Sequence, residues 1–242
     1  MEYQKRPNNL SSDKRNFGIH SFEVVVLSCL LLLLLKLPAV DLIDLWIQRL
    51  LFDQTDTSWM ISPNDRGLSY IIFYTSPKVI YVFLGVTSLF WLFRKWRKEG
   101  WQSQQSRLLL VVFVGVTVPL FVGWLKETTG VTCPDQESLF GGVSPHTSIW
   151  RNAIDGAYYY KLHCWPAGHA SGGFGLMAIR LLGPTGLDGW VWIVPGMTLG
   201  WVTGLYQMAR GQHFLSHTIV TMLIALLATS MAMIICRRYV TD

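Results

Sequence analysis

Long apolar runs constrain the fold of this chain more than any other feature of its sequence. A helix that crosses a membrane needs ~20 mostly apolar residues, and in lipid its backbone groups must pair within the helix. We therefore predict an all-α integral membrane protein with six transmembrane helices. The predicted spans cover approximately residues 22–43, 71–93, 108–125, 170–182, 190–208 and 214–236.

The composition supports this fold class. Only 14% of the residues are charged, against about 25% in soluble domains, and 51% are hydrophobic. The net charge of +5 does not indicate nucleic-acid binding, because the basic residues flank the apolar runs. No shift in composition divides the chain, so we expect a single membrane-embedded domain over residues 1–242, with a cytoplasmic tail at 1–20.

The distribution of basic residues predicts the orientation. Lys and Arg favour cytoplasmic segments, and they gather in the N-terminal tail, the 94–107 connection and the C-terminus. These segments share one side of a six-span protein. The connections 44–70, 126–169 and 209–213 are then external, which predicts a multi-pass protein of a bacterial inner membrane with both termini cytoplasmic. Residues 41–52 form an amphipathic pattern typical of a helix in the outer interface, or alternatively extend the first span.

Three polar stretches stand at the predicted outer ends of spans. The first is 126–134, which begins with Lys126; the second is 165–173, and the third is 207–217. Gly168 and His169 precede the fourth span, where free N–H groups of a helix start bind anions. His169 could then donate a proton to a leaving oxygen. The alternative is a helix cap with an interfacial histidine.

The third stretch carries His213 and His217, which are four residues apart and share a helical face. Gln207 and Arg210 would lie near that face if the helical path continued. Two alternatives remain: the pair could bind zinc, although no Glu separates the histidines as in metalloproteases, and Lys126 could merely reach toward the interface. Taken together, the stretches indicate a phosphate site with a nucleophile and an acid.

These stretches resemble the motifs of the type-2 phosphatidic acid phosphatase family, which shares its fold with the vanadium haloperoxidases. The family has Lys, six residues and Arg-Pro; then Pro-Ser-Gly-His; then Ser-Arg, five residues, His, three residues and Asp. The resemblance covers approximately residues 108–235 and implies a helical-bundle core of that type. It implies that His213 is the nucleophile, that His169 is the acid, and that Lys126, Arg210, Gly168 and Gln207 bind phosphate.

The sequence also departs from the family pattern. Cys133 replaces the first Arg, Ala167 replaces Ser, and Tyr206 and Gln207 replace Ser-Arg. Arg210 lies three residues nearer His213 than the family Arg does. His217 replaces the Asp, so we expect His217 to orient His213.

The resemblance implies a hydrolase of lipid metabolism that dephosphorylates a lipid A, undecaprenyl diphosphate or phosphatidic acid type of substrate through a phosphohistidine at the periplasmic face. The alternatives are a lipid phosphotransferase, an inactive member that binds lipid phosphate, and a transporter or haem-binding bundle. We expect no metal and no cofactor, because no Asp/Glu cluster accompanies the motifs. Membrane lipids are the expected partners.

The cysteines suggest one disulfide. Cys133 and Cys164 both fall in the external 126–169 connection, where an oxidising compartment favours pairing, and we predict a bond between them. Cys29 and Cys236 lie within or at the end of spans and should stay free. The polar segment 134–162 is expected to lie over the site and to help select the headgroup.

Overall fold

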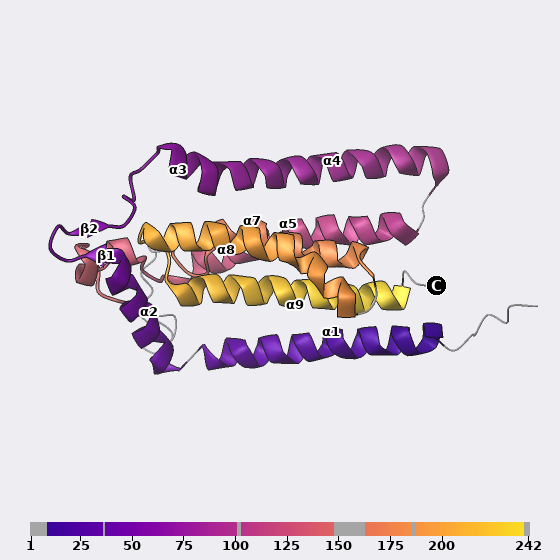
Figure 1. The fold of residues 1–242 in the computed structure, drawn as a ribbon, viewed down its shortest axis with the longest axis horizontal. Helices are drawn as coiled ribbons and strands as arrows, with labels where there is room; N and C mark the ends of the chain where they lie inside the picture. Colours follow the sequence, from indigo (N-terminus) through magenta and orange to yellow (C-terminus); the bar gives the residue numbers. More distant parts are fainter. Residues whose placement is uncertain (1–8, 36, 101–102, 148–162, 185–186, 240–242) are drawn as a thin grey trace, which may run out of the picture.

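The computed structural model describes residues 9–35, 37–100, 103–147, 163–184 and 187–239. Four long helices run along a common axis (Figure 1), and these are α1 (Asn9–Leu34), α4 (Ser76–Glu99), α5 (Ser103–Thr129) and α9 (Leu215–Tyr239). In the view of Figure 1, α1 and α4 lie on opposite outer sides, with α5 and α9 between them. The mostly helical bundle agrees with the predicted α-helical class.

The centre of the bundle contains shorter helical pieces. Helix α7 (Gly168–Gly175) continues into the 3₁₀ segment η4 (Leu176–Leu182), and the 3₁₀ segment η5 (Leu187–Ile193) leads into α8 (Val194–Ala209). The core packs the buried side chains of Phe174 and Met177 against α5 and α9. This core fixes the start of α7 and the end of α8, which are both places where the sequence predicts functional residues.

Glycines bring α8 unusually close to its neighbours. Gly196, Gly200 and Gly204 recur every four residues on one face of α8. A Cβ atom on Gly200 would lie 2.2 Å from the Phe174 ring, and one on Gly204 would lie 2.5 Å from the Thr218 side chain. Small residues at this spacing let helix backbones approach closely within membranes. We therefore attribute the tight packing of α8 on α7 and α9 to this row.

The number of predicted spans is only partly supported. Within the described residues, three helical segments are long and apolar enough to cross a membrane, namely Leu68–Lys98, Gln104–Gln136 and Leu215–Cys236. They match the predicted second, third and sixth spans. The predicted fourth and fifth spans are each divided between α-helical and 3₁₀ pieces among the described residues, so neither forms one long α-helix. Their many glycines favour close packing over helix continuity.

The predicted first span is interrupted. Helix α1 ends at Leu34, and α2 (Pro38–Leu51) begins with a proline. The direction of α2 differs from that of α1 by 79°. If this bent pair is one span, the described residues contain four. Proline cannot continue a preceding helix without losing a backbone hydrogen bond, which explains why the expected span over 22–43 is broken at its outer end.

Helix α2 has an inverted distribution of polarity. Asp44 and Gln48 are buried, whereas Leu42, Trp46 and Leu50 are exposed. The Gln48 amide donates to the backbone carbonyl of His213 at 2.8 Å. A polar face toward protein and an apolar face outward suit the outer interface of a membrane, so this geometry favours the interfacial helix over an extension of the first span.

The three polar stretches meet at one end of the bundle (Figure 1), where α5 ends and α7 and α9 begin. Helix α2, the hairpin of β1 (Phe52–Asp53) and β2 (Ser58–Trp59), and α3 (Leu68–Tyr70) lie at that end too. So do the short turns η2 (Pro134–Gln136) and η3 (Ser138–Phe140). Residues 148–162 of the predicted headgroup segment lie outside the described residues.

Candidate active site

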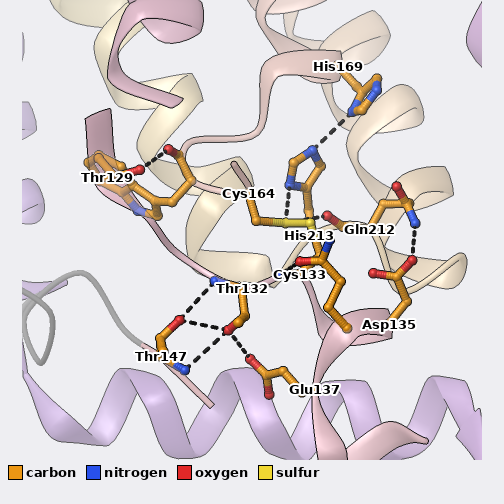
Figure 2. The surroundings of a disulfide bond; sticks show 12 residues. Thr129, Thr132, Cys133, Asp135, Glu137, Thr147, Cys164, His169, Gln212 and His213 are labelled. Carbon is orange, nitrogen blue, oxygen red and sulfur yellow. Dashed lines mark hydrogen bonds between the residues drawn. A yellow bond between two sulfur atoms is a disulfide. The ribbon is translucent and has the colours of Figure 1, made fainter. Parts of the chain in front are cut away.

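Two histidines from distant stretches form the centre of the site. His169 is the second residue of α7, and His213 lies in the turn between α8 and α9. The Nδ1 atom of His169 lies 3.0 Å from the Nε2 atom of His213, so one ring can donate a hydrogen bond to the other (Figure 2). The His213 side chain is almost fully buried. The structure therefore brings the predicted acid and the predicted nucleophile into direct contact.

The turn that carries His213 depends on Gly211. Helix α8 ends at Ala209, and Gly211 has a φ of +68°, which side-chain-bearing residues rarely adopt. A Cβ atom there would also lie 2.4 Å from the Trp59 ring. The N–H of Gln212 donates to the carbonyl of Gln207 at 2.9 Å and closes the turn. The helical path that would place Arg210 on the His213 face is therefore absent.

Arg210 contacts a different segment. Its guanidinium donates to the backbone carbonyls of Ser62, at 3.5 Å, and Pro63. It also lies over the Tyr70 ring at 5.2 Å and the Tyr206 ring at 5.5 Å. The charge remains near enough to contribute to the low pKa of His169. Arg210 is thus beside the histidine pair, held by the segment that precedes α3.

The sequence analysis also assigns Lys126, in α5, and Gln207, in α8, to the site. A Cβ atom built on Gly168 would lie 3.7 Å from the Lys126 Cδ, so the lysine stem runs along the start of α7. Gln207 is buried, and neither atom of its side-chain amide has a hydrogen-bond partner among the described residues. Because unpaired buried polar groups are costly, this amide is a candidate to bind a ligand oxygen.

Burial and positive charge keep both histidines neutral. Burial, with smaller contributions from the charges of Lys126, Lys78 and Arg210, lowers the pKa of His169 to about 3. Burial also lowers the pKa of His213 well below its usual value, and the neighbouring His169 and His217 add to that shift. A neutral His213 has a lone pair available for attack. An anionic phosphate in the site would offset the positive charges and favour protonation of His169.

His217 lies one helical turn after His213, in α9. The two ring centroids are 6.0 Å apart, and the described contacts include no hydrogen bond between the rings. The Nδ1 atom of His213 instead lies 3.6 Å from the Cys164 sulfur. The Nδ1 atom of His217 has no partner among the described residues. The carbonyl of His217 accepts the Ala167 N–H at 3.2 Å and so fixes the start of α7 against α9.

A disulfide lies directly beside the site. Cys133 and Cys164, the two cysteines that the sequence analysis pairs, are joined with a Cα–Cα distance of 5.1 Å (Figure 2). Cys29 and Cys236 are free. The bond connects the segment after α5 to the segment before α7. It therefore links the Lys126 stretch to the His169 stretch and supports the wall next to His213.

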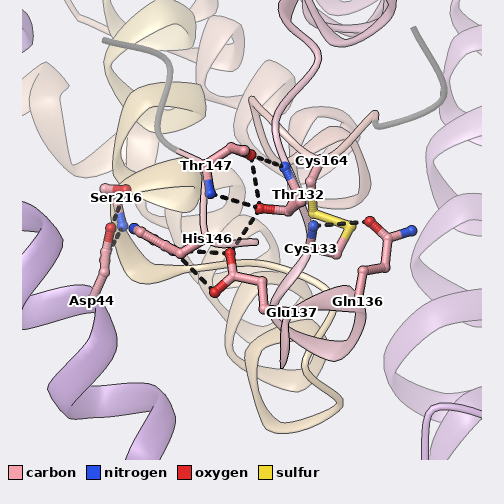
Figure 3. Close-up of polar contacts among 9 residues, drawn as sticks. All are labelled: Asp44, Thr132, Cys133, Gln136, Glu137, His146, Thr147, Cys164 and Ser216. Carbon is pink, nitrogen blue, oxygen red and sulfur yellow. Dashed lines mark hydrogen bonds and ion pairs between the residues drawn. A yellow bond between two sulfur atoms is a disulfide. The ribbon is translucent and has the colours of Figure 1, made fainter. Parts of the chain in front are cut away.

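A buried polar network holds the loop on the other side of the disulfide (Figure 3). The Thr132 hydroxyl donates to Glu137 at 2.8 Å and contacts the Thr147 hydroxyl at 2.8 Å. Glu137 also pairs with His146, whose Nδ1 lies 2.9 Å away. These contacts arise within residues 132–147 and give that loop a defined shape next to the site.

One group of side chains has the spacing of a metal site. Suitable atoms of Cys164, His213 and His217 lie within 4.8 Å of one another. The Cys164 sulfur is in the disulfide, and only a thiolate binds zinc, so two histidines remain. A catalytic zinc site normally has three protein ligands. The residues present therefore fit a zinc ion poorly.

The structure adds two residues that the sequence analysis missed. The Tyr74 ring lies 5.0 Å from the His169 ring, and the Lys78 Nζ lies 3.7 Å above the Tyr74 ring. Both belong to the segment that includes the π-helical turn η1 (Ile71–Thr75) and the start of α4. A lysine near the start of an apolar run was the available sequence signal, because charges at membrane depth are costly and tend to be functional.

A comparison with protein families agrees with this geometry. The family model of the PAP2 superfamily matches residues 106–240, which include all three polar stretches. The chain belongs to the PAP2 superfamily, whose members are generally phosphatases that act on phosphate esters. No curated protein and no solved structure matches the chain. The resemblance inferred from the motifs is thus confirmed at the level of the family.

Proposed function

We propose that this protein is a phosphatase that hydrolyses the phosphomonoester or diphosphate of a membrane lipid at the periplasmic face of a bacterial inner membrane. The contact between His169 and His213 supports this proposal most strongly. A nucleophile and a proton donor must both reach the transferred phosphoryl group, and these two nitrogens face each other. The apolar surfaces of the long helices favour a lipid substrate over a soluble phosphate ester.

The reaction follows from the positions of these groups. The lone pair of the His213 Nε2 atom attacks phosphorus, and the bond from phosphorus to the lipid oxygen breaks. The leaving oxygen takes a proton from His169. Water then attacks the phosphohistidine and gives a proton back to His169, the N–P bond breaks, and inorganic phosphate leaves. His169 therefore acts first as an acid and then as a base.

Other residues would stabilise the charge of the phosphoryl oxygens. Lys126 and Arg210 contribute positive charge beside the pair, and the Gln207 amide offers hydrogen-bond donors. Gly168 leaves the first N–H groups of α7 accessible. His217 is proposed to orient His213, as the Asp does in the family pattern, and this role would require a small rotation of the rings.

The decisive experiment is phosphate release from a panel of lipids by the purified full-length protein in detergent. The panel should contain lipid A, undecaprenyl diphosphate and phosphatidic acid, and excess chelator should be present. We expect release from at least one lipid, with wild-type rates in chelator. The absence of release from every lipid, together with retained binding of them, would support the inactive alternative. Recovery of activity only with an added metal would contradict the proposed reaction.

A further inference from the structure

A cavity lies on the α1 side of the bundle, between α1, α2 and α9. It has a volume of about 370 Å³ and is lined in part by His217. Neither His169 nor His213 lines it, and neither do the side chains proposed above to bind phosphate. Its size is within the range of ligand sites in proteins, ~300–1,000 Å³. The cavity is therefore a separate candidate for a bound molecule.

One end of this cavity is acidic. Asp41 and Asp44 of α2 line it, together with His146 and with Ser216 and His217 of α9, and among the described residues its lining includes no Lys or Arg. Asp44 is held in place because it accepts hydrogen bonds from the Ser216 N–H, at 2.9 Å, and from the Ser216 hydroxyl. Asp41 lies less than one helical turn earlier and is only partly buried. An anionic group placed directly against these carboxylates would be repelled, whereas a cation that donates hydrogen bonds would be attracted.

The other end of the cavity is apolar. Leu32 and Leu33 of α1, Leu35 directly after α1, and Val220 of α9 line it. Leu33 is 57% exposed, as expected for a side chain on the lipid-facing side of α1. An acyl chain could therefore lie along α1 while its headgroup stays at the acidic end.

We propose that this cavity binds a membrane phospholipid whose headgroup carries a primary ammonium, with the ammonium at Asp41 and Asp44 and one acyl chain along α1. The carboxylates supply the acceptors that the three N–H groups of an ammonium need. The bound lipid would connect α1 and α2 to α9 beside His217. This inference concerns binding alone and does not depend on the proposed reaction.

The direct test uses phosphatidylethanolamine with a photoreactive acyl chain, added to the full-length protein in mixed micelles. We expect cross-links in residues 29–40 and around Val220. Unlabelled phosphatidylethanolamine should compete at about tenfold lower concentration than phosphatidylglycerol. Phosphatidylglycerol lacks the ammonium, and the loss of one hydrogen bond to a charged group weakens binding by about this factor. Phosphatidylcholine, which has the positive charge but no N–H donor, should compete less well than phosphatidylethanolamine.

Two pairs of variants sharpen this test. Leu33→Trp should fill the cavity and reduce labelling, whereas Leu34→Trp should not, because Leu34 is 55% exposed and does not line the cavity. Asp41→Asn should remove the preference for phosphatidylethanolamine, whereas Asp56→Asn, outside the cavity, should retain it. Asp41→Asn keeps the size of the side chain, so it remains informative if Leu33→Trp does not fold.

Three results would overturn the proposal. One is labelling spread equally over the outward faces of α4 and α5. Another is equal competition by phosphatidylethanolamine and phosphatidylglycerol. The third is the same labelling in Leu33→Trp and Leu34→Trp. Because the readout is cross-linking, an inactive protein would still give an answer, and a failure of the proposed phosphatase activity would remain distinguishable from a failure of this inference.

Discussion

The Nδ1 atom of His169 lies 3.0 Å from the Nε2 atom of His213, so the proposed acid and the proposed nucleophile are in direct contact. In the proposed reaction, a phosphoryl group bound between these nitrogens would have to separate the two rings. The positive charges around them provide the attraction for this step, because they lower the pKa of His169 and would be neutralised by a phosphate.

Replacement of either histidine should abolish turnover. His213→Ala removes the attacking nitrogen and should lower turnover by several orders of magnitude, and His169→Ala should cost about 10²–10⁴-fold, the usual contribution of general acid–base catalysis. Labelled substrate and an alkaline quench should trap phosphate on His213 in the wild type. His163→Gln is a matched control, because His163 is half-exposed and pairs with Glu127 away from the histidine pair. Turnover near wild type in His213→Ala would end this assignment.

Lys78 should attract the substrate, since its charge acts on His169 across the Tyr74 ring. Lys78→Met is expected to lower kcat/KM by about five- to tenfold, as for a loss of about 1 kcal/mol of attraction, mainly through KM. Lys95→Met is the control, because the Lys95 Nζ lies 5.2 Å above the Trp91 ring at the other end of α4. Steady-state kinetics on the lipid that the panel identifies would measure both. Equal effects of the two variants would contradict a role for Lys78.

His217→Asp distinguishes two roles of His217. If His217 orients His213, Asp should preserve or raise turnover, because a carboxylate accepts a hydrogen bond and stabilises the positively charged phosphohistidine. If His217 instead binds phosphate as a cation, Asp should be worse than Ala. We expect the first result, measured as kcat for both variants across pH. A lower rate for Asp than for Ala would assign His217 to the phosphate.

The disulfide can be checked by counting thiols. The unreduced, denatured protein should show two free thiols, from Cys29 and Cys236, and the reduced protein should show four. Cys164→Ser should destabilise the protein by about 4 kcal/mol in the loop-entropy model, since the linked residues are 31 apart in sequence. It should also lower activity, because the Cys164 sulfur lies against the His213 ring. Four free thiols before reduction would exclude the bond.

Acid should destabilise the folded protein through the same histidines. The pKa of His169 is about 3 in the folded state, and that of His213 is also lowered, whereas an unfolded histidine titrates near ~6.5. Between these values the unfolded chain binds more protons, so the free energy of unfolding falls as the pH drops below ~6.5, by up to about 1.4 kcal/mol per pH unit for each histidine.

Thermal unfolding in detergent between pH 7.5 and 5 would measure this dependence. His169→Gln removes one of the two histidines that take up a proton on unfolding. The free energy of unfolding should therefore fall less steeply with decreasing pH than in the wild type. The contribution of neutral His169 to the free energy of unfolding is complete above the pKa of an unfolded histidine and is lost at lower pH. Above neutral pH, we therefore expect no pH dependence of stability from His169. An unchanged slope in His169→Gln would show that His169 is not buried in its neutral form.

Hydrophobicity and spacing predicted the bundle well where helices are continuous. The predicted spans at 71–93, 108–125 and 214–236 coincide with helices of spanning length. The same reasoning could not foresee the 3₁₀ pieces in the centre, because an apolar run has the same composition whether it forms one long helix or two short pieces. The break before Pro38 was signalled by that proline, but the turn of α2 depends on contacts such as Asp44–Ser216, between residues far apart in sequence.

The candidate site was predictable where its chemistry resides in short motifs. His169, His213, Gly168 and Lys126 meet as the order of the stretches implies. The sequence analysis placed Arg210 near the His213 face on the condition that the helix continued, and the turn at Gly211 ends that helix. Tyr74 and Lys78 join the site only because α4 packs beside α7, and no pattern within their own segment reveals that neighbour.

The glycine row of α8 has a consequence for how this sequence can vary. At Gly196, a Cβ atom would lie 2.3 Å from the Met177 backbone nitrogen, so even a methyl group would separate the helices that carry the catalytic stretches. Leu120 of α5 and Phe83 of α4 face outward and can be exchanged for other apolar residues at little cost. Substitutions should therefore accumulate slowly at the glycines of α8 and quickly at the outward-facing positions of α4 and α5.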